Sequence, residues 1–165
     1  MFRSALLVTA SLFASHAFSH DDGSKSWQVL GKVSFKTSCS KAAQPKFNRA
    51  VALLHSFWYT EAEAAFKEIV AQDPSCAMAY WGLASILMNN PIAGQGAVGK
   101  APELAQAALE KAAANPPKTQ REHDYIEAVS AYYKDFAQRT ERERQQARAD
   151  AYEKLAAQYP VHDEA

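Results

Sequence analysis

Helical periodicity dominates the chain from Pro45 onward. Apolar residues recur there three or four positions apart in six segments, and Pro residues mark most of the short turns between them. This spacing places the apolar side chains of each segment on one face of an α-helix. The segments span residues 45–59, 60–72, 73–90, 101–115, 119–137 and 140–160. The pattern predicts an all-α protein built from tandem antiparallel helix hairpins.

Residues that cap helices stand at the expected helix starts. A Thr followed three residues later by a Glu is typical of a capping box, in which each side chain bonds a backbone N–H of the first turn. This spacing occurs at Thr60 and Glu63, at Thr119 and Glu122, and at Thr140 and Glu143. For the third helix we expect Asp73 or Ser75 to be the cap.

The first 19 residues have the layout of a cleaved secretory signal. Arg3 precedes an apolar run over residues 5–14, and small residues follow at Ser15 and Ala17, or at Ala17 and Ser19, so cleavage would fall after Ala17 or Ser19. The run is shorter than the about 20 residues that a membrane-spanning helix needs. We therefore expect residues 1–19 to be a signal peptide and the mature chain to reach the periplasm or the extracellular space. An uncleaved amphipathic helix is the alternative.

Residues 20–43 form a lead-in to the helices. The brief alternation of Val29, Val33 and Phe35 predicts either a short strand or an extended segment. Cys39 lies in this lead-in, and Cys76 lies at the expected start of the third helix. In an exported protein an even pair of cysteines favours a disulfide, which would tie the lead-in against the first hairpin. Two buried free thiols are the alternative.

Charge excludes some classes of partner. The chain has 18 basic and 18 acidic residues, and the charged run over 139–148 alternates in sign. A neutral chain without a basic block has no general attraction for nucleic acid or anionic lipid. The alternating run is typical of a solvated helix face.

A repeat is present within the helical part of the chain. Ala62, Phe66 and Pro74 are spaced A-x3-F-x7-P, and small and large residues alternate over 80–87. This pattern resembles the tetratricopeptide repeat, a helix–turn–helix unit of about 34 residues. The resemblance covers residues 44–160 and implies three degenerate hairpins that stack as a short right-handed solenoid.

The chain also resembles a group of exported bacterial repeat proteins of unassigned function. That resemblance lies in the strings VSFKTSC, FNRAVALLHSFWYTEAEAAF, DPSCAMAYWGLA and REHDYIEAVSAYY. Members of the group look longer than this chain, and residues 161–165 resemble the start of a further repeat. The chain is therefore interpreted as a truncated copy or a fragment of a longer repeat protein.

The tetratricopeptide resemblance implies a ligand-binding concave face. Carrying its positions over gives seven ligand-binding residues, which are Phe47, Val51, His55, Met78, Trp81, Ser85 and Met88. Trp81 and Met88 are large apolar side chains suited to anchoring a peptide. The alternative is that these residues pack against the lead-in or against a following hairpin.

Two motifs could suggest ligand binding or catalysis, but the residues around them do not support either. The string GQGAVGKA over 94–101 is similar to a phosphate-binding loop, but a helix precedes it and no hydroxyl follows the Lys. His123 and Glu127 share a helix face and are interpreted as a solvated pair. We expect no enzyme activity, cofactor or metal, and no catalytic constellation is readable.

The leading hypothesis is an exported, non-catalytic module that binds a protein or peptide on its concave face. The alternative is a metal or redox accessory protein of the bacterial envelope that uses His20, His55 or the cysteines. A hydrolase that has lost its catalytic part is a third hypothesis.

Overall fold

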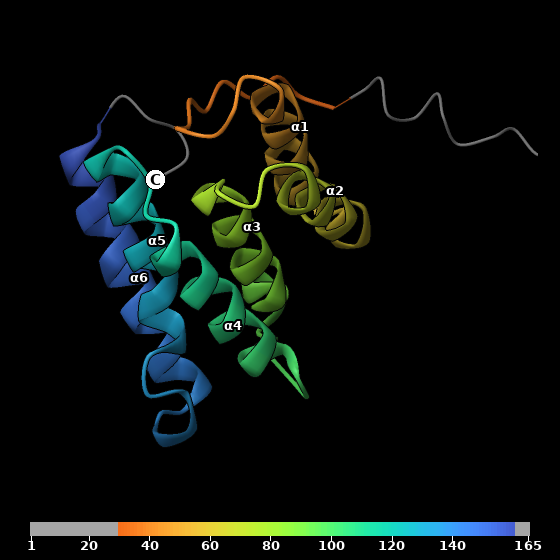
Figure 1. The fold of residues 1–165 in the computed structure, drawn as a ribbon. Coiled ribbons are helices and arrows are strands. Elements are labelled where there is room, and N and C mark those ends of the chain that lie inside the picture. The colour runs from red at the N-terminus through yellow and green to blue at the C-terminus, as the bar shows by residue number, and fades with distance from the viewer. Residues whose placement is uncertain (1–29, 161–165) are drawn as a thin grey trace, which may run out of the picture.

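The computed structural model describes residues 30–160, so the predicted signal peptide, His20, Val29 and residues 161–165 lie outside the described part of the chain. The described part holds six α-helices and no strand, which confirms the all-α prediction. The helices are α1 (Ala43–His55), α2 (Tyr59–Gln72), α3 (Ala77–Leu87), α4 (Ala101–Ala114), α5 (Gln120–Tyr133) and α6 (Glu141–Gln158), as Figure 1 shows. Two short 3-10 turns, Pro91–Ala93 and Phe136–Gln138, lie in the connections.

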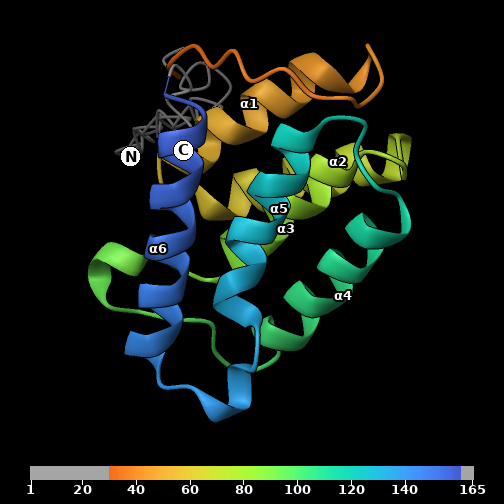
Figure 2. The same cartoon turned by 90° about the vertical axis from the view of Figure 1, so that its left-hand side faces the viewer.

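The lead-in forms neither a strand nor a helix over residues 30–40 and bends at residues 38–39, so the short strand, one of the two predicted conformations, is wrong. It passes over the end of the bundle near α1 and α5 (Figure 2). The predicted disulfide is confirmed, because Cys39 and Cys76 are bonded with their Cα atoms 4.6 Å apart. This bond fastens the lead-in to the residue that precedes α3.

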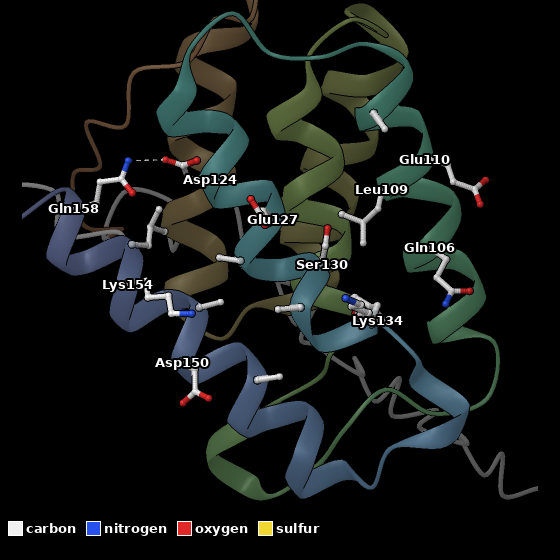
Figure 3. Close-up of a pocket in the computed structure, with 17 residues that line it drawn as sticks. Gln106, Leu109, Glu110, Asp124, Glu127, Ser130, Lys134, Asp150, Lys154 and Gln158 are labelled. Atoms are coloured by element: carbon white, nitrogen blue, oxygen red, sulfur yellow. Dashed lines mark hydrogen bonds between the residues drawn. The ribbon is translucent and has the colours of Figure 1, made fainter.

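The helices form three hairpins, and α2 packs against α3 while α5 packs against both α3 and α4. In Figures 2 and 3, α4 and α6 lie on opposite sides of α5. The α6 helix reaches α3, since the indole N–H of Trp81 donates a hydrogen bond to the Tyr152 hydroxyl at 3.3 Å. The hairpins are observed, and a regular right-handed solenoid stays a prediction.

One apolar core runs through the hairpins. Phe47 from α1, Phe66 from α2 and Tyr125 from α5 are fully buried in it. Gly82 lets α2 and α3 approach closely, because a Cβ at that position would lie 2.3 Å from the Phe66 ring. The larger members of the core are Phe35, Phe47, Leu53, Phe66, Ile69, Met78, Trp81, Tyr125, Val129, Tyr132 and Tyr133.

The capping predictions have different outcomes. The box of Thr140 and Glu143 is confirmed in both directions at the start of α6. Thr119 caps α5 by accepting from the Glu122 N–H, but the box is incomplete, because the Glu122 carboxylate accepts from the Thr119 hydroxyl and from the Ser38 N–H of the lead-in. Thr60 is wrong as a cap, because α2 begins one residue earlier at Tyr59.

Local geometry explains the shifted helix starts. Phe57 has a left-handed φ of 60°, and this tight turn directs the chain into α2 immediately after Trp58. Asp73 and Ser75 are also wrong as caps of α3, whose N-cap is Cys76 without a side-chain bond. The Asp73 carboxylate instead accepts from the Ser40 N–H at 2.8 Å and from the Ser75 hydroxyl at 2.7 Å.

Within residues 30–160, no helix combines the length and the apolar character needed to cross a membrane.

Candidate interaction surfaces

Most of the predicted ligand-binding residues are buried. Phe47, Val51 and Met78 have no exposed surface, and Trp81 and Met88 are each 3% exposed. The expectation that these five side chains line an open face is therefore wrong. They belong to the core, which is the alternative interpretation of the same residues.

The lead-in covers the face formed by α1, α3 and α5. The ring of Phe35 lies 5.6 Å from that of Phe47, 5.9 Å from that of Trp81 and 4.8 Å from that of Tyr125, measured between centroids. One lead-in side chain thus contacts a helix of each hairpin. The edge-on and tilted ring geometries are those that aromatic pairs prefer.

Polar groups fix the lead-in to the helices. The Gln44 side chain accepts from the Thr37 N–H and donates to the Phe35 carbonyl, both at 2.8 Å. The buried Glu122 carboxylate accepts from the Ser38 N–H at 2.6 Å. Because each of these bonds satisfies a backbone group of the lead-in, the segment is held without a sheet partner.

Arg121 also holds the lead-in in place. Its guanidinium donates to the Lys36 carbonyl and lies 4.6 Å from the centroid of the Phe35 ring. A cation over an aromatic face is attracted by the ring quadrupole.

The remaining two predicted ligand-binding residues are partly accessible. Ser85 is half-buried, and its hydroxyl donates to the Trp81 carbonyl at 2.9 Å. His55 is exposed in the last turn of α1. The structure does not bring these two side chains together with an open apolar surface.

An open groove lies elsewhere, between α4 and α6 with α5 as its floor (Figure 3). Its volume is about 1090 Å³. The apolar lining consists of Leu109, Ala113, Ala128, Ala131, Tyr133, Ala147, Ala151 and Leu155. The polar lining consists of Gln106, Glu110, Asp124, Glu127, Ser130, Lys134, Asp150, Lys154 and Gln158.

Some of the polar side chains that line the groove already form hydrogen bonds within the chain. Asp124 accepts from the Tyr159 hydroxyl at 2.6 Å and from the Gln158 amide at 3.0 Å, and this hydrogen bond raises the pKa of Tyr159. Burial raises the pKa of Tyr133, whose hydroxyl donates to the Ala84 carbonyl at 2.7 Å. Through these contacts Tyr133 has a structural role in the lining of the groove, and Tyr159 fixes Asp124 from outside it.

Sequence reasoning missed this groove, although one signal for it was present. Ala128 and Ala131 in α5, and Ala147 and Ala151 in α6, recur three or four residues apart. Small residues at that spacing form a shallow stripe along a helix. The same spacing also occurs in any amphipathic helix, so by itself it does not indicate a groove.

The Gly-rich segment 94–101 is a connection that packs against the third hairpin. The Ala97 N–H donates to the Tyr132 hydroxyl at 2.9 Å, and that hydroxyl donates to Glu141 at 2.8 Å. Burial raises the pKa of Tyr132. Among residues 30–160, no group of three His, Cys, Asp or Glu side chains is placed to hold a metal ion.

Comparison of the chain with protein-family models, with curated proteins and with solved structures returned no match. The tetratricopeptide resemblance therefore stays a prediction from the sequence.

Proposed function

We propose that this chain is an exported, non-catalytic helical module that binds a segment of another protein. The binding site in this proposal is the groove between α4 and α6, because the lead-in already occupies the face formed by α1, α3 and α5. The observation that carries the proposal is the form of that groove. It is open along three helices, and its lining mixes small apolar side chains with charged ones.

Export is part of the proposal on two grounds. The first 19 residues have the layout of a secretory signal. The disulfide between Cys39 and Cys76 is of a kind that persists in oxidising compartments.

Crosslinking and affinity capture of the exported chain from its native compartment tests the function. The chain is compared with an Ala147→Trp variant, which places a large side chain in the groove, and with Ala149→Trp, which places it on the exposed side of the same helix. A protein captured by the parent and by Ala149→Trp but lost with Ala147→Trp is the expected result. Equal capture by all three chains, or capture by none, would contradict the proposal.

A further inference from the structure

The walls of the groove limit what kind of segment can occupy it. All three walls are α-helices, whose interior N–H and C=O groups are already paired within each helix. An extended segment would find few backbone partners there, so its own peptide groups would lose water without compensation. A helix satisfies its backbone internally and therefore suits such a groove.

The length of the groove fits a short helix. On α5 the lining residues run from Asp124 to Lys134, and on α6 from Ala147 to Gln158. At about 1.5 Å per residue, each stripe is roughly 15 Å long, which corresponds to about three helical turns.

The small residues of the lining define the apolar face of the segment that would occupy the groove. Ala131, Ala147 and Ala151 are only partly buried and leave holes along the two helices near Leu109, whereas Ala128 and Leu155 of the lining are buried in the core. Close packing requires the occupant to supply the missing bulk. Leu, Ile or Phe side chains at positions i, i+3, i+4 and i+7 of a helix would enter these holes.

The charged side chains of the lining indicate which charges the occupant carries and in which direction it lies. The lining has four carboxylates, at Glu110, Asp124, Glu127 and Asp150, and two ammonium groups, at Lys134 and Lys154. Figure 3 places Glu110, Asp124 and Glu127 toward one end of the groove, and Lys134 together with Asp150 toward the other. A helix with basic flanks, and with its positive N-terminal end at the carboxylate end, matches this distribution.

We infer that the partner segment is an amphipathic helix of about three turns, with large apolar residues on one face, Lys or Arg beside them, and its N-terminus at the end marked by Asp124 and Glu127. This inference rests on the proposed function. It names the chemical class of the segment that the groove receives.

Three synthetic 14-residue helical peptides test the inference against the full chain by fluorescence anisotropy. The first carries Leu at i, i+3, i+4 and i+7 with Lys beside the stripe. The second replaces Lys by Glu, and the third has the composition of the first with its Leu positions scrambled. We expect the first peptide to bind at least tenfold more tightly than the other two. Binding should fall at least tenfold with Ala147→Trp and stay unchanged with Ala149→Trp.

Charge reversal gives an independent measurement. The double variant Glu110→Lys, Glu127→Lys should prefer the Glu-flanked peptide. The control Glu103→Lys, Glu153→Lys changes exposed residues of α4 and α6 outside the groove and should keep the original preference. A photoreactive group at the N-terminus of the first peptide should label the Asp124 end of α5 rather than the Lys134 end. Equal binding of the Lys-flanked and scrambled peptides would overturn the inference.

The two proposals fail in different ways. A native partner whose capture depends on Ala147, but which none of the helical peptides displaces, would keep the function and reject the helix. Absence of any Ala147-dependent partner would reject the function. A dimer of the chain that Ala147→Trp dissociates would identify a second copy as the occupant and would also reject the inference.

Discussion

At the scale of single residues, one hydrogen atom determines how closely α2 and α3 approach. Gly82 faces the ring of the fully buried Phe66, and a Cβ there would lie 2.3 Å from it. Replacing a helical Gly by Ala normally stabilises a helix by about 1 kcal/mol. Here we expect the opposite sign, because the ring has no space into which it can move.

Gly82→Ala is expected to lower the free energy of unfolding by about 1–3 kcal/mol, since overpacking of a core forces strained side chains. Urea denaturation provides the measurement. Gly31→Ala serves as the control, because nothing lies within 4 Å of a Cβ at that exposed lead-in position. A stabilised Gly82→Ala chain would contradict the close approach of the two helices.

Asp73, which accepts a hydrogen bond from the lead-in, should make the stability of the fold depend on pH in acid. The Ser75 hydroxyl, followed by bonds from Ser40, holds the pKa of this carboxyl below its ordinary value of 3.8. A lowered pKa in the folded state gives stability that is present above the unfolded value and lost as the pH falls through the folded value. The contribution should therefore begin to fall near about pH 4 and be lost as the pH decreases further.

Asp73→Asn should flatten the acid limb of the stability curve. Asn keeps a carbonyl oxygen that can accept from Ser40 but has no charge to lose. Denaturation midpoints measured between about pH 5 and pH 2 should fall less steeply for the variant than for the parent chain. Equal slopes for the two chains would remove Asp73 from the acid response.

At the scale of elements, the start of α6 depends on its cap. Leu155 is the one buried residue of this helix, whereas α3 has eight, so packing contributes less to α6 than to α3. Thr140→Ala removes the observed capping box and should cost about 1 kcal/mol. Thr60→Ala is the matched control, because Thr60 lies inside α2 and caps nothing, and thermal unfolding of both variants checks the difference.

The disulfide determines whether the lead-in stays in place. It closes a loop with a sequence separation of 37, so its loss should destabilise the fold by about 3–4 kcal/mol in the chain-entropy account. A Cys39→Ala, Cys76→Ala chain should also be cut by proteases within residues 30–42 faster than the parent. Limited proteolysis followed by mass spectrometry measures this. A protected lead-in in that variant would show that Gln44, Glu122 and Arg121 suffice to hold it.

At the scale of the whole molecule, the lead-in joins the three hairpins. Phe35 contacts Phe47, Trp81 and Tyr125, which belong to different hairpins. Phe35→Ala should lower the free energy of unfolding by about 3–5 kcal/mol, as expected for a fully buried Phe. Leu104→Ala in α4 is the control, because Leu104 is 56% exposed and its loss should change stability by less than about 0.5 kcal/mol. Calorimetry of both variants distinguishes the two cases.

The sequence was sufficient to predict the helices but not how they assemble. Each helix follows from a local pattern, as the confirmed Thr140 cap illustrates. The position of the lead-in depends on contacts such as Ser38 with Glu122, which are 84 residues apart and leave no periodic trace. For that reason the apolar stripe of Trp81 and Met88 was interpreted as a binding face, whereas it lies beneath another part of the chain.

The candidate groove was beyond prediction for a related reason. Alanines such as Ala131 and Ala147 pack against a neighbour in most helical hairpins, and the sequence gives no orientation for α6. The structure places α4 and α6 on opposite sides of α5, and this arrangement leaves those alanines open. The groove is therefore a property of the assembled helices.

The buried position of Phe35 also has a consequence for the chain during its synthesis. Its partner Tyr125 is made 90 positions later. A ribosome that adds roughly 5–20 residues per second needs about 5–18 s to cover that distance. Phe35 and the first hairpin are therefore synthesised before Tyr125, while the aromatic cluster that buries them is still incomplete. Any chaperone that meets the growing chain therefore encounters exposed aromatic rings, and the final closure of the core waits for the third hairpin.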